Sequence, residues 1–485
     1  MIPILNDTTR RFTTRDNLGI TGATTSLQAV LCPVINTVTP RAFYWPFMVW
    51  NYYEYIEATK EQRRQRDVND FDKNFLKRND YFFVLGNLLT NQDQMNLVGK
   101  DNTADDIRPD RTVYDYNEKY FVSRYGGMQY YNAGCDTLYY ITSVDNDNVR
   151  QKFPLLNENL GLPLALAFVE AVKDTDYYQY YRRQGNQVPV EALKQWGERV
   201  NLTMNHLGEC KELLKKSLFE PVSNPRLHNA NLIASSNLMR FLYRGNHNPS
   251  VEQVRELLYQ HYYQMRIEHS FPDNLCEISI SWETVVARQY MALALEIMWK
   301  SLLKKLVTPI TMSYWIDNTI RDSKFLSIRL NDRIEDIVNN YNYTSAEIEK
   351  LLKSGSGASG KTETLFESAI IVLLSIYNRF KGREDINPEY LAYGEDVSIT
   401  NLLLEIDSHM NNSVNDLLRF FAENWILKRH LDVARNKMYY GRDAFYFYMD
   451  QELCFCKKSD ANPDFPGLRL MQLMQVMKDL DMFYE

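Results

Sequence analysis

Cysteine is scarce in this chain of 485 residues, and no two cysteines form a Cys-x-x-Cys pair. The six cysteines are Cys32, Cys135, Cys210, Cys276, Cys454 and Cys456. Cys454 and Cys456 lie two apart in an expected strand and share one face, but a metal site there would need two further ligands nearby. We therefore expect free, reduced and mostly buried thiols, as in cytoplasmic proteins, and no metal bound by them.

Long hydrophobic runs are also missing. The longest runs, LGLPLALAFVEAV and AIIVLLSIY, are too short to span a bilayer. The N-terminal residues MIPILNDTTRRFTTRD lack the charged-then-apolar order of a signal peptide. Hydrophobic residues make up 45% and charged residues 24% of the chain, which is the balance of soluble globular proteins rather than disordered ones. We therefore expect a soluble, cytoplasmic protein with no membrane contact.

The chain has no excess of positive charge. Its formal net charge is −7 and its sequence pI is about 5.7. Nonspecific coating of nucleic acid depends on neutralising phosphates, so this charge balance argues against it. A single local basic site remains open, and the densest basic cluster comprises Lys428, Arg429, His430, Arg435, Lys437 and Arg442.

Signatures of catalysis are absent from the sequence. The seven histidines form no HExxH motif, and neither GxSxG nor a Cys–His–Asn pattern indicates a nucleophile. We therefore expect no catalytic residues, no metal ligands and no cofactor. An enzyme whose site is assembled from distant residues stays open as an alternative, either nucleotide-dependent or a nuclease.

One glycine-rich segment, KSGSGASGKTETLF, contains a formal match to the phosphate-binding loop at Gly355, Gly360, Lys361 and Thr362. That loop requires a β-strand leading into it, so that backbone N–H groups cradle the phosphates while the lysine reaches them. The residues before it, TSAEIEKLLKS, have a helical pattern instead. We therefore reject the match and interpret the segment as a flexible Gly/Ser linker.

What the sequence has in abundance is apolar residues at helical spacing, which predict a mainly α fold of several multi-helical domains. The run PRAFYWPFMVWNYYEYI is aromatic on nearly every side and is expected to be a buried helix. Polar or Gly/Ser-rich stretches suggest the domain boundaries. The expected regions are an aromatic-rich N-terminal domain (1–145), a helical middle domain (150–350), a linker or loop (353–362) and a C-terminal domain (363–485).

The C-terminal region predicts a helix, a β-hairpin and a closing helix. The run SVNDLLRFFAENWILKRHLDVARNKM is amphipathic, the alternating segment FYFYMDQELCFC reads as a hairpin, and a second apolar stripe follows it. A helix followed by a hairpin resembles a winged-helix unit, which would place the basic cluster against DNA. The length of the helix, the absence of positive charge at the hairpin tip Asp450-Gln451 and Asp432 four residues beyond Lys428 weigh against this interpretation.

Several short motifs spread over most of the chain carry a family resemblance. They are Thr14-Arg15-Asp16-Asn17-Leu18-Gly19-Ile20, Pro40-Arg41-Ala42-Phe43-Tyr44, the Trp45–Trp50 run, the segment Leu193–Trp196-Gly197, Trp425 with Arg429-His430-Leu431, Ala434 and Lys437, the hairpin above, and the closing LMQVMKDLDMF. On these motifs the chain resembles an uncharacterised family of bacterial proteins that carries a domain-of-unknown-function label.

The resemblance implies a genomic setting rather than a reaction. Members of that family tend to be encoded beside helicases, methylases or nucleases in phage-defence islands, and the family has no established catalytic residues. We therefore expect a non-catalytic accessory or scaffold subunit of a bacterial antiphage defence system, which acts through protein–protein contacts, with DNA as an open further partner. The alternatives are the enzyme described above and a winged-helix DNA-binding regulator.

Overall fold

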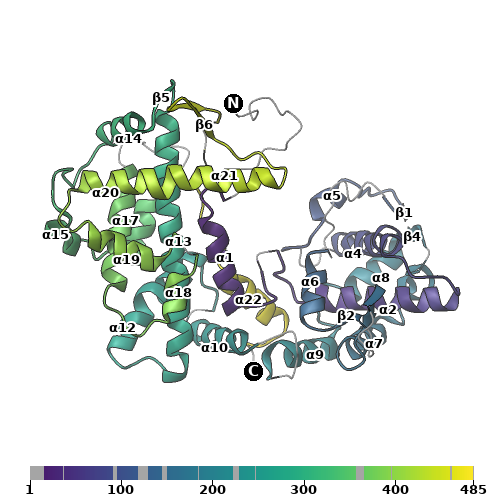
Figure 1. The fold of residues 1–485 in the computed structure, drawn as a ribbon. Coiled ribbons are helices and arrows are strands. Elements are labelled where there is room, and N and C mark those ends of the chain that lie inside the picture. Colours follow the sequence, from purple (N-terminus) through teal and green to yellow (C-terminus); the bar gives the residue numbers. More distant parts are fainter. Residues whose placement is uncertain are drawn as a thin grey trace. The chain divides into compact units, whose positions relative to one another are not determined.

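The structure is a computed structural model, and its helical content confirms the prediction of a mainly α fold (Figure 1). It describes residues 16–36, 38–90, 95–117, 129–144, 150–183, 185–221, 229–245, 247–356, 365–394, 396–458, 461 and 463–483. Within these residues the strands are short and form small antiparallel sheets. None of the helices described there is both long enough and apolar enough to cross a membrane.

The chain divides into two compact units, each made of two segments that are far apart in the sequence. Unit 1 comprises Met1–Gln28 and Asn248–Gly467, and unit 2 comprises Ala29–His247 and Leu468–Glu485. The segments at 145–150 and 353–362, where the sequence suggested boundaries, lie inside unit 2 and unit 1 respectively.

Unit 2 is built from helices with two small two-stranded sheets. Its helical elements are α2 (Tyr44–Glu61), α3 (Val68–Asp70), η1 (Phe71–Leu76), α4 (Lys77–Leu89), α5 (Lys100–Ala104), α6 (Gln129–Thr137), α7 (Gly161–Val172), η3 (Tyr177–Tyr181), α8 (Val190–Arg199), α9 (Gly208–Phe219), α10 (Ala230–Gly245) and α22 (Arg469–Asp479). Its strands are β1 (Val113–Asp115), which pairs with β4 (Gln187–Pro189), and β2 (Ile141–Val144), which pairs with β3 (Arg150–Leu156).

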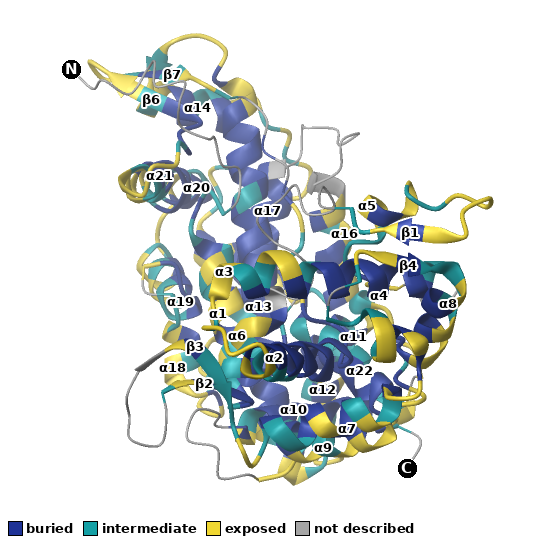
Figure 2. Cartoon of the chain, turned by 90° about the vertical axis from the view of Figure 1, so that its right-hand side faces the viewer, coloured by how far each residue is buried: buried dark blue, intermediate teal, exposed yellow. Residues whose placement is uncertain are grey.

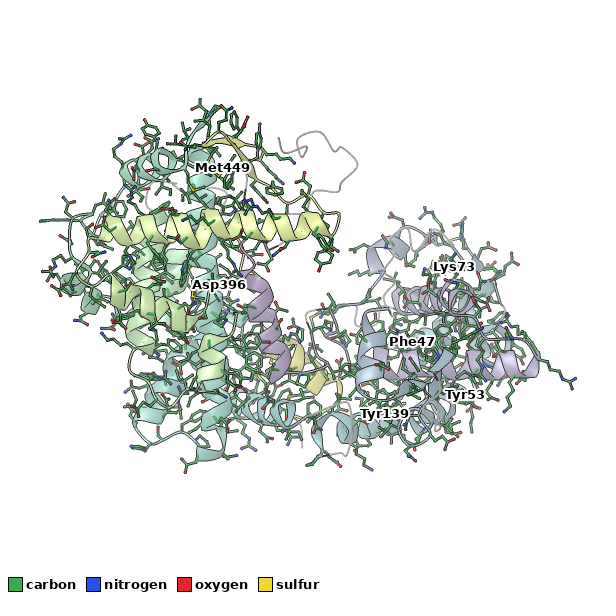
Figure 3. All side chains as sticks on the ribbon, in the orientation of Figure 1. Phe47, Tyr53, Lys73, Tyr139, Asp396 and Met449 are labelled. Carbon is green, nitrogen blue, oxygen red and sulfur yellow. The ribbon has the colours of Figure 1, made fainter. Side chains whose placement is uncertain are left out.

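The aromatic helix α2 forms the core of unit 2, as its sequence predicts. Figure 2 shows α2 almost entirely in the colour of buried residues, and Phe47, labelled in Figure 3, is fully buried. The ring of Phe47 stacks on Trp50 with 5.4 Å between centroids, and Trp50 in turn lies 5.7 Å from Trp196 of α8. Large rings in contact on several sides explain why the first half of α2, from Tyr44 to Tyr52, is buried all round, whereas Lys60 and Glu61 at its end are exposed.

A buried ion pair ties α22 to the residues just before α2. The Nε atom of Arg41 donates to Oδ2 of Asp479 at 2.9 Å, and the backbone N–H of Ala42 donates to the same oxygen at 3.0 Å. The other guanidinium nitrogens donate to the carbonyls of Met95 and Leu202, at 2.7 and 2.9 Å. Burial raises the pKa of Asp479 to about 6 despite the neighbouring guanidinium.

Helices α4 and α8 approach each other through two glycines. An added Cβ on Gly86 would lie 2.7 Å from the carbonyl oxygen of Leu193, and one on Gly197 would overlap the carbonyl group of Gly86. Because glycine has no Cβ, the backbones of the two helices come into direct contact at these two residues.

Unit 1 is organised around α13 (Asp273–Lys305), a 33-residue helix that is buried along most of its length. The other helical elements are α1 (Ile20–Leu31, whose last residues fall in unit 2), α11 (Val251–Glu256), η4 (Leu257–His261), α12 (Tyr262–Ile267), α14 (Met312–Arg321), α15 (Ile334–Ile337), η5 (Val338–Asn340), α16 (Ser345–Ser356), α17 (Leu365–Phe380), α18 (Pro388–Ala392), α19 (Ile399–Ser408), α20 (Val414–Phe420), η7 (Phe421–Lys428) and α21 (Arg429–Tyr439).

A cluster of one glutamate and three arginines holds α12, α13 and α17 together. Glu283 of α13 is fully buried and pairs with Arg266, with Arg379 (Nε to Oε1, 2.8 Å) and with Arg383 (Nη1 to Oε1, 2.8 Å). The ring of Tyr263 lies 3.3 Å from the guanidinium carbon of Arg379. We call these five residues the Glu283 cluster.

The predicted C-terminal helix and hairpin are both present, but they do not form a unit with the closing helix. The hairpin strands β6 (Phe447–Asp450) and β7 (Leu453–Cys456) join β5 (Ile310–Thr311) in a three-stranded sheet of order β5-β7-β6. This sheet belongs to unit 1, whereas α22 belongs to unit 2.

Candidate interaction surface

The predicted basic cluster lies on a long helix made of α20, η7 and α21, which follow one another without interruption (Figure 1). A capping box starts it, in which Ser413 and Asp416 each accept from the other's backbone N–H. The central stretch, η7, is π-helical, so its N–H groups bond to carbonyls five residues earlier. The wider turn shifts the direction of every side chain that follows it relative to a regular α-helix.

His430 lies in the core of unit 1 and has no exposed surface. Its Nε2 accepts from the backbone N–H of Tyr446 at 3.1 Å, its Nδ1 lies 3.2 Å from the carbonyl oxygen of Asn17, and its ring lies 4.6 Å from that of Trp299. Burial lowers the pKa of His430 to about 4. This imidazole is therefore a neutral packing group, and it has no surface from which to contact a phosphate.

Two of the basic residues are exposed but paired with acids of the same helix. Nζ of Lys428 lies 2.8 Å from Oε1 of Glu423, and Nη1 of Arg435 lies 3.0 Å from Oδ1 of Asp432. Exposed pairs of this kind contribute little stability, but they cancel much of the local positive charge. The sequence suggested that Asp432 neutralises Lys428, but in the structure Asp432 pairs with Arg435 instead.

Two further basic residues fasten the N-terminal segment of unit 1. Arg429 donates to the carbonyl of Leu18 at 3.0 Å and pairs with Asp396 at 3.0 Å, and Lys437 donates to the carbonyl of Asp16 at 2.6 Å. Their charges are therefore used within unit 1. Asp396, which precedes α19, is labelled in Figure 3.

The last turn of α21 presents two exposed aromatic rings beside a basic residue. Tyr439 is 86% exposed and Tyr440 is 78% exposed, and their rings meet edge to face at 5.3 Å. Gly441, with a φ of +74°, ends the helix, and the N–H of Arg442 returns to the carbonyl of Lys437 at 3.0 Å. The side chain of Arg442 is exposed, and its guanidinium has no hydrogen-bond or ion-pair partner in the described part of the chain.

We call Tyr439, Tyr440 and Arg442 the tyrosine edge. The sequence pointed to Arg442 but not to the two tyrosines. The available signal was Gly441, because a glycine directly after an amphipathic helix marks its end and places the preceding residues in the last turn. In that last turn the apolar face of the helix extends beyond the core, so Tyr439 and Tyr440 are exposed.

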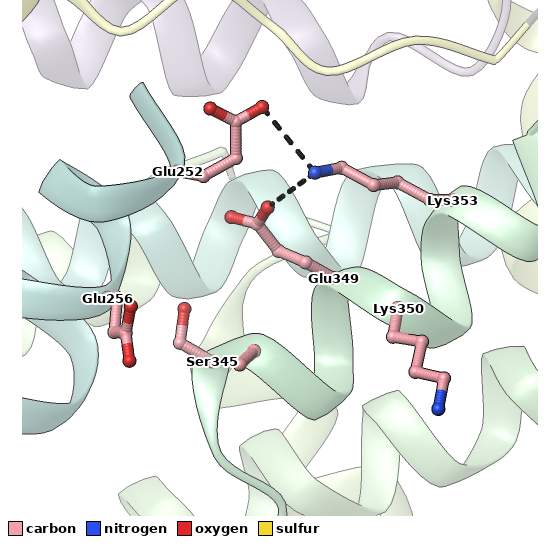
Figure 4. A pocket seen from close by; sticks show the side chains of 7 residues that line it. Glu252, Glu256, Ser345, Glu349, Lys350 and Lys353 are labelled. Atoms are coloured by element: carbon pink, nitrogen blue, oxygen red, sulfur yellow. Dashed lines mark hydrogen bonds and ion pairs between the residues drawn. The ribbon is translucent and has the colours of Figure 1, made fainter. Parts of the chain in front are cut away.

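A pocket of about 370 Å³ lies between α11 and α16 (Figure 4). Nζ of Lys353 bridges Glu252 of α11 at 3.5 Å and Glu349 of α16 at 3.3 Å. Oε1 of Glu349 also lies 3.4 Å from Nη1 of Arg255. These charges are used to hold the two helices together, and the pocket presents no arrangement that indicates a reaction.

The glycine-rich segment begins at the end of a helix. Gly355 lies in the last turn of α16, which runs to Ser356. Gly360, Lys361 and Thr362 lie outside the described residues, so the interpretation of 353–362 as a linker stays a prediction. Within the described ranges no three His, Cys, Asp or Glu side chains are grouped so that they could hold a metal ion.

One carboxyl group of unit 1 is expected to make stability depend on pH near neutrality. Desolvation, together with Asp16 and Asp464, raises the pKa of Glu296 to about 8 from 4.5, whereas a bond from Thr21 opposes the shift. The folded protein therefore keeps a proton that the unfolded chain loses near pH 4.5. The stability that Glu296 contributes is fully present below about pH 4.5 and is lost as the pH rises through about 8.

The variant Glu296→Gln carries a neutral side chain of the same shape and removes this dependence. We expect the fall in unfolding free energy between about pH 5 and about pH 8.5, measured with urea, to become smaller by about 1–3 kcal/mol. The same substitution at the exposed Glu277 of α13 is the control. An unchanged profile in Glu296→Gln would show that this carboxyl group is ionised in the folded protein.

Comparison of the chain with protein-family models, with curated proteins and with solved structures gave no match.

Proposed function

We propose that the protein is a non-catalytic accessory subunit of a bacterial antiphage defence system, and that it docks onto a partner protein through the tyrosine edge. The observation that carries the proposal is the exposure of two adjacent rings, Tyr439 and Tyr440, each of which is more exposed than the tyrosines Tyr180 (67%) and Tyr314 (54%). The partners that the family resemblance suggests are the helicase, methylase or nuclease subunits of such a system.

The chemistry of the tyrosine edge fits a protein partner. Tyrosine and arginine are enriched at the centres of protein–protein interfaces, because they bury a large area while losing few rotamers. Leaving two adjacent rings in water forgoes the free energy that their burial would supply. The positive charge of Arg442 adds a preference for an acidic partner surface.

DNA is the second candidate partner, and Arg442 beside two rings is the observation that favours it. Single-stranded nucleic acid binds where bases stack on exposed rings next to cations. A winged-helix mode would instead use α21 with the hairpin β6–β7. Two observations argue against both modes of DNA binding. Lys428 and Arg435 are paired with acids, and His430 is buried.

The test is copurification and quantitative binding of the double variant Tyr439→Ser/Tyr440→Ser. We expect its affinity for the protein encoded by a neighbouring gene to fall by about tenfold or more, since one interface hot-spot residue is worth about 2 kcal/mol. The melting temperature should stay within about 1 °C of the wild type, because both rings are exposed. Tyr180→Ser, which removes a 67% exposed tyrosine from unit 2, is the matched control and should bind normally.

Three results would contradict the proposal. Undiminished binding by the double variant would exclude the tyrosine edge as the docking surface. Intrinsic turnover by the isolated protein would contradict an accessory role. Salt-dependent DNA binding that Arg442→Glu abolishes, in the absence of any protein partner, would assign the surface to DNA instead.

A further inference from the structure

Within the described residues, Arg288 is a buried cation without a carboxylate partner. It lies in the middle of α13 with no exposed surface, and its Nη2 donates to the carbonyl of Val397 at a long 3.4 Å. Its Nε and Nη1 atoms have no hydrogen-bond partner in the part of the chain that the structure describes. Two other buried arginines do have a carboxylate partner: Arg41 pairs with Asp479, and Arg255 pairs with Glu349.

An uncompensated buried charge is costly. Moving an ion out of water costs several kcal/mol even after the protein relaxes, and proteins normally offset the cost with a counterion and hydrogen bonds. Here burial lowers the pKa of Arg288 to about 10, which still leaves the group charged at neutral pH. The guanidinium therefore has three N–H bonds and a full charge to offer to an anion.

The N-terminus of α19 lies at the same place. Val397, whose carbonyl receives Nη2 of Arg288, immediately precedes the N-cap Ser398, and both residues are buried. The Oγ atom of Ser398 accepts from the N–H of Asn401 at 3.1 Å. The first N–H groups of a ten-residue helix such as α19 point towards its N-terminus and favour negative charge there.

Gly394 keeps this place open to the guanidinium. A Cβ at this position would lie 2.6 Å from Nη2 of Arg288 and 2.9 Å from Cβ of Ala23. The φ of Gly394 is +93°, a conformation that other residues rarely adopt. Position 394 therefore requires a glycine, because the guanidinium of Arg288 and the methyl group of Ala23 both occupy the space that a Cβ would need.

We infer that Arg288 and the N-terminal end of α19 form a binding site for a phosphate group. Phosphate has several acceptor oxygens, so it can receive N–H bonds from Arg288 and from helix amides at once, as it does at other helix N-termini. The group is either inorganic phosphate or the monoester of a nucleotide. The Asp396–Arg429 pair connects the residues before α19 to α21, so an occupied site would also hold that helix.

The first experiment is a thermal titration of the full-length protein with inorganic phosphate at constant ionic strength, with sodium chloride as the reference salt. We expect the melting temperature to rise with phosphate by about 2–4 °C at ten times the dissociation constant. In Arg288→Met we expect this response to disappear and the melting temperature in phosphate-free buffer to rise, because an unpaired buried charge is replaced by an apolar side chain of similar length.

Arg255→Met is the matched control, since Arg255 is also buried but pairs with Glu349. This variant should melt at a lower temperature and keep the phosphate response. Should Arg288→Met fail to fold, Arg288→Lys provides the test, because it keeps the charge while losing the fork of donors and should bind phosphate about tenfold more weakly.

The source of the phosphate group is decided by a parallel titration with nucleoside monophosphates. A response to both ligands supports inorganic phosphate, and a response to the nucleotide alone supports a monoester ligand. Three results would overturn the inference: a melting temperature that neither ligand changes, an equal response to sodium chloride, or a phosphate response that Arg288→Met retains.

Discussion

Replacing Glu283 by alanine is expected to lower the free energy of unfolding by about 3–5 kcal/mol, because three arginines would lose their shared counterion. Glu283 is fully buried, and the side chains of Arg266, Arg379 and Arg383 are each about one-tenth exposed, at 9%, 11% and 10%. Water therefore cannot replace the missing carboxylate, and like charges would face each other in a poorly solvated place.

Urea denaturation followed by circular dichroism measures this loss. The control is Glu423→Ala, which removes the exposed partner of Lys428 and should cost at most about 1 kcal/mol. If the two variants lost similar amounts of stability, the Glu283 cluster would not be the ionic core of unit 1.

The second large effect is expected for Gly197→Ala. The new Cβ would overlap the carbonyl group of Gly86, a backbone atom that cannot turn aside as a side chain can. Helices α4 and α8 would have to separate, and the contact of Trp196 with Trp50 would loosen with them. We expect a loss of about 3 kcal/mol in the free energy of unfolding and a lower melting temperature in calorimetry.

Gly208→Ala is the matched control for this substitution. Gly208 is the first residue of α9, it has no atom within 4 Å of an added Cβ, and alanine favours the helix. The control should be neutral or slightly more stable, by up to about 1 kcal/mol. A Gly197→Ala variant as stable as this control would mean that α4 and α8 are not in backbone contact.

Local patterns were sufficient to predict the mainly α fold and some of its elements. The all-round aromatic run of α2 describes a buried helix, and most of its residues are buried. The alternation in FYFYMDQELCFC described the hairpin β6–β7, because successive strand residues face opposite sides of a sheet. These predictions succeed since they depend on neighbours a few residues apart.

The basic cluster shows where such predictions stop. Nothing near His430 in the sequence reveals that Trp299, more than a hundred residues earlier, covers its ring. The partners of Arg429 and Lys437 also come from distant segments, at Asp396 and Asp16. In addition, η7 shifts the side-chain directions after Phe421, so a regular helical projection assigns the wrong residues to the surface.

The Glu283 cluster and Arg288 were not predicted for the same reason. Glu283 and Arg288 lie within one turn and a half of each other on α13, and in the sequence both look like ordinary charged residues of a helix. Only the packing of α12 and α17 around the helix gives Glu283 three arginines and leaves Arg288 without an acid.

The discontinuous composition of unit 2 has a consequence for biosynthesis. Arg41 and Asp479 are 438 positions apart in the chain, and a ribosome releases the first long before it makes the second. Until α22 has been synthesised, the guanidinium of Arg41, just before α2, has no Asp479 carboxylate to pair with. Newly made chains should therefore depend on chaperones for as long as translation takes, and stalled products that lack α22 should be degraded rather than accumulate.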